Sequence, residues 1–222
     1  MNDFEFLNLS NDLRALATEI PLNWGRVQTN HIDDKINMFQ IADYQTLEES
    51  IVDLNDEHKN YLRRRWYLWK CSQCDEYLFY INNNVEQNPN PYDKSYDIII
   101  NNNLAFDIKG TVIPYKMRNR ANEIIADPTE MIHFFYTEQS TGRRYDIQNR
   151  LFIVHHSFVD TKRELYLRCA WQTKKDCYNK FSKLAQSLNF IPYDNVMSGV
   201  IFVLEYEKGK VEVKICGENE SR

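Results

Sequence analysis

The chain has 222 residues, of which 43% are hydrophobic and 27% charged, so it can bury the core of one sizeable domain. Its formal net charge of −5 does not indicate a nucleic-acid partner, although such a sum can hide a local basic face. The six glycines are isolated from one another, which excludes a phosphate-cradling loop, a dinucleotide fingerprint and the serine-hydrolase elbow.

The cysteines and the apolar runs bear on the location of the protein. Five cysteines at irregular spacing argue against the disulfide framework of a small secreted domain. The acidic start "MNDFEFLNLSND" lacks the apolar core of a signal peptide, and no apolar run approaches the ~20 residues that span a bilayer. We therefore expect a reduced, cytoplasmic protein that does not bind membranes.

The N-terminal part of the chain is predicted to be helical. Residues 10–20 predict a short helix inside an irregular arm that extends to residue 45. A long helix is predicted to start at Thr46, because Glu49 three residues later completes a capping-box pattern. Its apolar residues recur at helical spacing, and we expect the helix to end between residues 70 and 79.

The rest of the chain alternates predicted strands and helices. Residues 82–94, rich in asparagine and proline, predict a loop before a hairpin with strands at residues 95–100 and 104–109. The later elements are a helix with Asp127 as N-cap and Pro128 as its first residue, a buried strand over 149–158, a candidate strand over 165–171, a helix over 172–190 and a hairpin over 198–216 that turns at Lys208 and Gly209.

This order of elements predicts an α/β (α+β) fold. We expect a central mixed β-sheet flanked by helices, followed by a C-terminal helix and β-hairpin. The whole chain, residues 1–222, is predicted to form a single domain.

The first hairpin carries an aspartate on each strand. With Asn101 to Asn103 as the turn, Ile100 faces Leu104, and counting outwards puts Asp97 opposite Asp107. Opposed residues on paired strands have Cβ atoms ~4.5–5.5 Å apart. Two carboxylates at that range repel each other, so they either share a proton or bind a cation such as Mg²⁺.

A lysine completes this cluster. Lys109 lies two residues beyond Asp107, so a strand brings both side chains to the same face. A metal ion next to an ammonium group suits the hydrolysis of a phosphodiester, because both stabilise negative charge on the phosphate. A surface strand with alternating polar residues is the alternative, but the flanking runs "DIII" and "LAF" are apolar.

Asp97 and the run Asp107-Ile108-Lys109 resemble the motif of the PD-(D/E)XK (restriction-endonuclease-like) nuclease superfamily. The resemblance covers residues 46–157 and leaves residues 1–45 as an N-terminal arm and 158–222 as a C-terminal extension. It implies a restriction-endonuclease-like core in which a helix, a three-stranded meander, a second helix and a further strand follow one another.

The resemblance also implies a role for each residue of the motif. Asp97, Asp107 and the main-chain carbonyl of Ile108 would bind Mg²⁺ (or Mn²⁺), and Lys109 would be the catalytic lysine. Tyr96 replaces the proline that gives the motif its name. Some members supply another acidic residue from the first core helix, for which the candidates here are Glu49, Glu57 and Glu76, with Glu76 nearest the hairpin.

The function implied is that of a metal-dependent endonuclease acting on double-stranded DNA, in restriction, another defence role or repair. The alternative is a non-catalytic nucleic-acid-binding or assembly protein that keeps the nuclease fold. Cutting both strands with one site per chain would call for a homodimer. The basic residues that we expect to contact phosphates are Lys116, Arg118, Arg143, Arg144 and Arg150, unless they are solvated surface charges.

Two other groups of residues leave alternatives open. Cys71 and Cys74 have the spacing of half a zinc site or of a redox pair, but they also suit plain thiols on a helix. His155 and His156 end the predicted buried strand, where one could act as a general base or be a hydrogen-bonded core residue.

Overall fold

The computed structural model describes residues 1–20, 30–90, 93, 95–138 and 148–218. Across these residues the protein has a mixed α/β fold built on one sheet of seven strands. The strands are β1 (Val85–Gln87), β2 (Ile98–Ile100), β3 (Leu104–Val112), β4 (Arg150–Ser157), β5 (Ile191–Tyr193), β6 (Val196–Glu207) and β7 (Lys210–Ile215).

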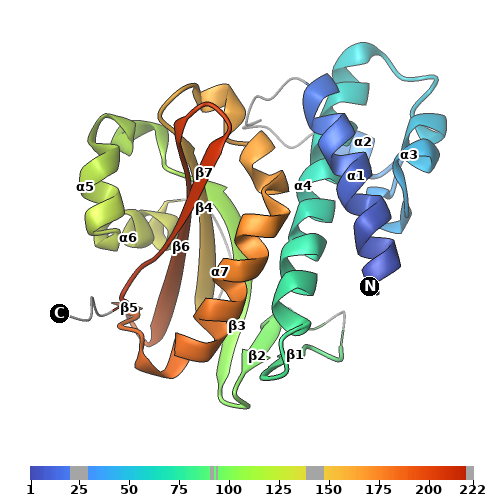
Figure 1. Ribbon diagram of the computed structural model, residues 1–222. Coiled ribbons are helices and arrows are strands. Elements are labelled where there is room, and N and C mark those ends of the chain that lie inside the picture. The colour runs from blue at the N-terminus through green and yellow to red at the C-terminus, as the bar shows by residue number, and fades with distance from the viewer. Residues whose placement is uncertain (21–29, 91–92, 94, 139–147, 219–222) are drawn as a thin grey trace.

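The sheet changes from antiparallel to parallel pairing across its width (Figure 1). β1, β2 and β3 form an antiparallel meander, whereas β4 runs parallel to both β3 and β6. β5 and β7 both pair antiparallel with β6, at different stretches of that long strand. The order β1-β2-β3-β4-β6-β5, with β7 also on β6, confirms the predicted mixed sheet.

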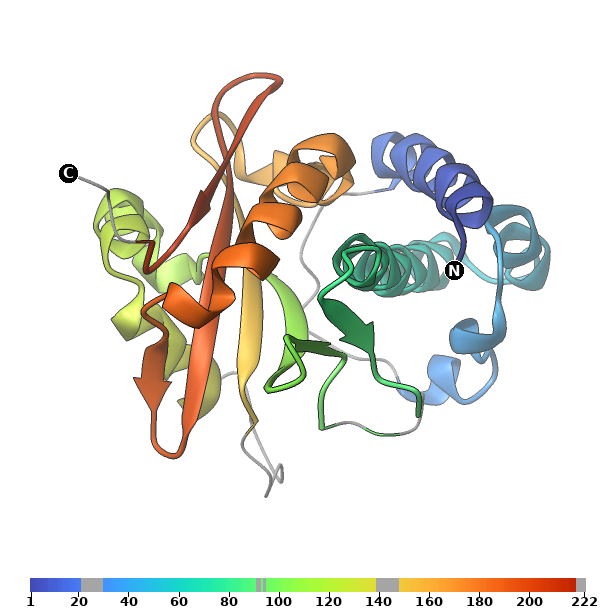
Figure 2. The same cartoon turned by 60° about the horizontal axis from the view of Figure 1, so that its bottom comes forward.

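Helices cover both faces of this sheet (Figures 1 and 2). The α-helices are α1 (Asp3–Glu19), α2 (Asn30–Asp33), α3 (Tyr44–Ser50), α4 (Asp56–Tyr80), α5 (Ala121–Ala126), α6 (Thr129–Thr137) and α7 (Trp171–Leu184). Side chains of α4 and α7 share one buried cluster with Phe106 and Ile108 of β3, and those of α5 and α6 share another with Phe152 of β4.

The N-terminal helices form a further layer. α1, α2 and α3 lie on the side of α4 that faces away from the sheet, so α4 is enclosed between them and the strands (Figure 2). α1 is longer than predicted because it begins at Asp3, where the side chain of Asn2 accepts the Glu5 N–H and Glu5 returns a bond to the Asn2 N–H. No helix in the described part of the chain is both long and apolar enough to cross a membrane.

The prediction of one long helix from Thr46 is wrong, because two helices occupy this region. Asp43 caps α3 by accepting the Thr46 N–H at 2.8 Å, so Thr46 lies inside the first turn and does not start it. Asn55 then caps α4 by accepting the His58 N–H at 2.9 Å. Asp and Asn are stronger N-caps than Thr, which explains both starts.

Two further predicted elements differ in the structure. The segment 82–94 is not all loop, because β1 lies within it and completes the meander. Residues 165–171 do not form a strand but contain the 3₁₀ helix η4 (Tyr166–Cys169). There the Tyr67 hydroxyl donates to the Leu165 carbonyl at 2.6 Å and Lys174 Nζ to the Arg168 carbonyl at 3.0 Å, so side chains satisfy carbonyls that a strand would pair with a neighbour.

Most of the remaining predicted elements are confirmed, although α7 ends at Leu184, six residues before the predicted end of that helix. β4 and the β6–β7 hairpin have the predicted positions, and Gly209 adopts a left-handed φ of 83° in the hairpin turn. Pro128 is the N-cap of α6, one position earlier in the helix than predicted, and Asp127 accepts the Thr129 N–H at 3.0 Å.

Candidate functional site

The hairpin of β2 and β3 has the predicted turn and register. Asn101 and Asn102 adopt left-handed φ values of 51° and 60°, and Ile100 is paired with Leu104. Asparagine tolerates this conformation better than most residues, which fixes the turn at this point of the sequence. β2 is shorter than predicted and starts at Ile98.

The two aspartates lie close enough for the charge of Asp107 to raise the pKa of Asp97, but they are not a regular cross-strand pair. The paired residues end at Ile98 and Phe106, and the Asp97 N–H donates to the Phe106 carbonyl at 2.8 Å, one residue out of register, as in a β-bulge. The predicted position of Asp97 directly opposite Asp107 is therefore not observed. Asp97 Oδ2 accepts the Ile108 N–H at 2.6 Å. The N–H and C=O of one strand residue point to the same side, so the Ile108 carbonyl also points toward the edge of β3 where Asp97 lies.

Two cations contact Asp107. The Lys109 ammonium contacts Oδ1, and Arg150 Nε lies 3.5 Å from Oδ2. The Asp107 side chain is 8% exposed, whereas that of Lys109 is 39% exposed, so solvent reaches the cluster past Lys109. Both oxygens of this carboxylate are therefore neutralised by the protein itself.

Burial and repulsion between carboxylates raise the pKa values of Asp97 and Glu76. The pKa of Asp97 is raised, mainly by its burial and then by the charge of Asp107, while Lys109 opposes the shift. Burial, followed by the charge of Asp97, raises the pKa of Glu76 to about 8. The cluster thus holds more carboxyl groups than its two cations can keep ionised.

Of the three candidate helix carboxylates, Glu76 is the one whose pKa responds to the charges of Asp97 and Asp107. It lies near the C-terminal end of α4, close enough to Asp97 and Asp107 for both charges to raise its pKa. Glu57 is in the first turn of the same helix, about 28 Å away along the axis at 1.5 Å per residue. Glu49 lies on α3, where its carboxylate accepts a bond from Gln45 at 2.9 Å.

A row of polar side chains crosses three strands from this cluster. Asp107 on β3 is paired with Arg150 on β4, and Arg150 with Ser198 on β6. Tyr136 of α6 covers the row: its ring centroid is 4.8 Å from the Arg150 guanidinium carbon, and its hydroxyl lies 3.0 Å from Ser198 Oγ. The Arg150 side chain, which we predicted to contact phosphate, is only 9% exposed and lies against Asp107 and Tyr136.

The sequence did not predict that Tyr136 and Ser198 lie beside Arg150 in this row. A signal was present for the arginine only: Arg150 directly precedes the apolar run "LFIV", so a buried strand begins with a charge. A charge at that position must have a partner, and the partner is Asp107 of the neighbouring strand.

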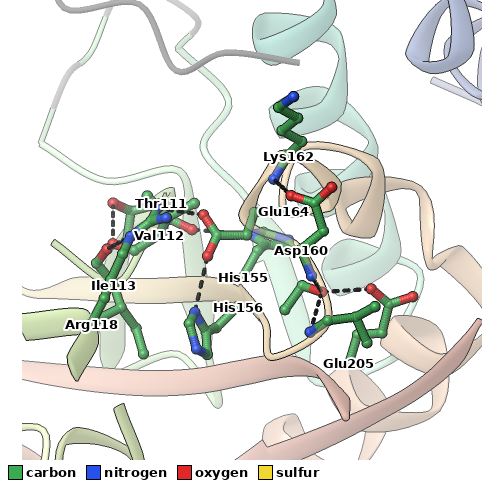
Figure 3. Close-up of polar contacts among 12 residues, drawn as sticks. Thr111, Val112, Ile113, Arg118, His155, His156, Asp160, Lys162, Glu164 and Glu205 are labelled. Atoms are coloured by element: carbon green, nitrogen blue, oxygen red, sulfur yellow. Dashed lines mark hydrogen bonds and ion pairs between the residues drawn. The ribbon is translucent and has the colours of Figure 1, made fainter. Parts of the chain in front are cut away.

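Two of the other predicted phosphate contacts, Arg118 and Lys116, are paired with carboxylates of the protein itself. Arg118 donates to the Ile113 carbonyl at 3.2 Å and pairs with the buried Glu164 (Figure 3). Its guanidinium group is therefore bound by groups of the protein itself. Lys116 is exposed and pairs with Glu138 at 2.9 Å. Arg143 and Arg144 lie outside the described residues.

His155 and His156 at the end of β4 are buried core residues. His155 Nδ1 lies 3.1 Å from the Thr111 carbonyl, and His156 Nδ1 lies 2.9 Å from Glu164 Oε1 (Figure 3). Cys71 and Cys74 are buried thiols of α4 without a disulfide, and burial raises the pKa of both. Among the described residues, no three His, Cys, Asp or Glu side chains already stand where they could hold a metal ion between them.

No family model, curated protein or solved structure matches this chain.

Proposed function

We propose that this chain is a divalent-metal-dependent nuclease with a restriction-endonuclease-like, PD-(D/E)XK core, which hydrolyses DNA phosphodiester bonds. The observation that carries the proposal is the two neighbouring carboxylates, Asp97 and Asp107, with Lys109 beside them and Glu76 within reach of their charges.

The chain order around this cluster supports the proposal. α4 leads into the meander β1, β2 and β3, and the helices α5 and α6 then lead to β4, which runs parallel to β3. The resemblance to PD-(D/E)XK nucleases implies this same order of elements, with the acidic residues on the second and third strands.

The donor atoms of the cluster fit a hard divalent cation. Asp97, Asp107, Glu76 and the Ile108 carbonyl offer oxygen only, which favours Mg²⁺ or Mn²⁺ over zinc. The raised pKa values of Asp97 and Glu76 reflect repulsion and desolvation that a bound cation would relieve. The Lys109 ammonium now contacts the oxygen of Asp107 that an ion would need, so it must move aside when an ion binds.

Each residue of the cluster then has a separate task in hydrolysis. A bound ion would neutralise the phosphate and lower the pKa of a water molecule. Asp97, Asp107 and the Ile108 carbonyl would hold it, and Arg150 keeps Asp107 in place from the buried side. Lys109, released from Asp107 and partly exposed, can donate hydrogen bonds to a phosphate oxygen or to the attacking water.

A cleavage assay tests this proposal. Plasmid DNA, linear DNA and RNA are incubated with Mg²⁺, Mn²⁺, Ca²⁺ or excess chelator, and we expect cleavage of DNA with the first two only. Ca²⁺ should support binding without efficient turnover, because its larger and looser coordination positions water poorly. The variant Asp107→Asn controls for contaminating nucleases.

Three results would contradict the proposal. They are cleavage that continues in excess chelator, a stoichiometric zinc ion in the purified protein, and DNA binding without cleavage under any metal condition. The last would favour the non-catalytic nucleic-acid-binding protein.

Removing the Arg150 charge should destabilise the protein through Asp107. Arg150→Met leaves a buried carboxylate with one cation fewer, which costs about 2 kcal/mol of unfolding free energy. In the background of Asp107→Asn the same change should cost much less, because no charge is then left uncompensated. Urea unfolding of the four proteins of this cycle measures the coupling, and equal costs in both backgrounds would show that Arg150 contributes packing alone.

A further inference from the structure

The outer edge of β7 has no partner strand among the described residues. β7 pairs with β6 on one side only, and Cys216 just beyond it donates its N–H to the Val200 carbonyl at 2.9 Å. Residues alternate along a strand, so Lys214 and Glu212 also point their N–H and C=O groups toward β6. The alternate residues Val211, Val213 and Ile215 point these groups outward, where they can pair with another strand.

A groove runs along this edge. α7 flanks β7, and between them lies a space of about 460 Å³ whose lining includes Cys177, Val213 and Ile215. Its rim carries both signs of charge, with Asp176 and Lys180 on α7. A strand added to β7 would place apolar side chains against this groove and continue the buried cluster of that face.

The sequence of β7 identifies the strand that fits. Between its apolar residues β7 carries Lys210, Glu212 and Lys214, and Glu212 and Lys214 are both exposed. We infer that β7 pairs antiparallel with β7 of a second copy of this chain, about a two-fold axis through Val213. Glu212 then lies opposite Lys214 of the partner subunit on both sides of the axis.

Charge decides between this register and its neighbours. An axis through Glu212 would place Glu212 opposite its own copy and Lys210 opposite Lys214, and like charges directly opposite each other are unfavourable. An axis through Val211 would pair Glu212 with Lys210 but would leave Ile215 outside the paired segment. Only the axis through Val213 matches the charges and uses all three outward-pointing residues.

The test is the mass of the protein in solution, measured by sedimentation velocity over a range of concentrations without metal or nucleic acid. Its outcome does not depend on the proposed nuclease function. We expect a monomer–dimer equilibrium that Glu212→Lys and Lys214→Glu each weaken on the order of tenfold, since each puts like charges opposite each other. The double variant Glu212→Lys/Lys214→Glu restores opposite charges and should dimerise like the parent.

Lys210→Glu is the matched control, because Lys210 lies outside the segment paired about Val213. It should leave the equilibrium unchanged, and a weakening by Lys210→Glu together with no effect of Lys214→Glu would overturn the register. Melting temperatures are compared for all variants, since Lys214 Nζ also donates to the Ile125 carbonyl at 3.3 Å.

Hydrogen exchange gives a second readout. The outward amides of Val211, Val213 and Ile215 should become protected as the protein concentration rises, whereas that of Glu212, which points to β6, should be protected at every concentration. A parent that remains monomeric at all concentrations, or a double variant that is not rescued, would refute the pairing. Lys210 and Lys214 would then be charges that prevent the exposed edge of β7 from pairing with another strand.

Discussion

Lys109→Met is expected to bind a divalent cation at least about tenfold more tightly than the parent, about 1.4 kcal/mol, and yet to cleave DNA at least ~100-fold more slowly. Metal binding improves and cleavage slows because the Lys109 ammonium has two roles, one without metal and one during hydrolysis. Without metal it contacts Asp107 Oδ1, where it competes with an incoming cation. During hydrolysis it would stabilise the charge that develops on the phosphate.

The measurements are Ca²⁺ affinity by calorimetry, where turnover does not interfere, and the cleavage rate with Mg²⁺. Asp107→Asn should lose both properties, because a ligand and its charge disappear together. Lys162→Met is the matched control: Lys162 (Figure 3) is an exposed lysine of the 3₁₀ helix η3 (Thr161–Arg163), which follows the end of β4 opposite to Arg150, and it should change neither value. If Lys109→Met weakens Ca²⁺ binding, the lysine does not compete with the ion.

Glu76→Gln should change how stability depends on pH. The pKa of Glu76 rises from 4.5 to about 8 in the folded protein, so the native state holds a proton that the unfolded chain releases at lower pH. The associated stability is fully present below about pH 4.5 and is lost as pH rises through about 8. The loss amounts to several kcal/mol at most, at about 1.4 kcal/mol per pKa unit.

Glutamine cannot ionise, so Glu76→Gln should flatten this decline and be more stable than the parent above about pH 8. Chemical unfolding at several pH values in chelated buffer measures the effect. Ca²⁺ should raise the stability of the parent more at pH 8 than at pH 6, because binding replaces the proton of Glu76. Glu57→Gln, on the same helix, should keep the slope of the parent, and equal slopes for all three proteins would place Glu76 outside the cluster.

The sequence was sufficient for the hairpin because the signals there are local. Three consecutive asparagines between apolar runs determine the turn, and the turn determines which residues face each other. The strand that carries Arg150, the helix α7 and the final hairpin are likewise short-range patterns of apolar residues and turn formers. Such local patterns predict the element without any knowledge of the residues that pack against it.

The features that were missed depend on residues far apart in the chain. The site of Arg150 is buried only because Tyr136 of α6 covers it and Asp107 of β3 neutralises it. The segment after Leu165 reads as a strand, but its carbonyls are taken by side chains of α4 and α7. The choice of Glu76 over the other acidic residues needed the distance from α4 to the hairpin, which no spacing in the sequence contains.

The left-handed pair Asn101 and Asn102 has a consequence for how the protein can diverge. The turn sets the register of β2 against β3, so the insertion or loss of one residue in this turn would shift Asp97 away from the Ile108 N–H that it accepts, without altering any residue of the cluster. Chains descended from a common ancestor with this one can therefore exchange the asparagines for other residues that tolerate a left-handed backbone. What they must keep is the number of residues between the two aspartates, and a comparison that scores identities while allowing gaps in loops would overlook that constraint.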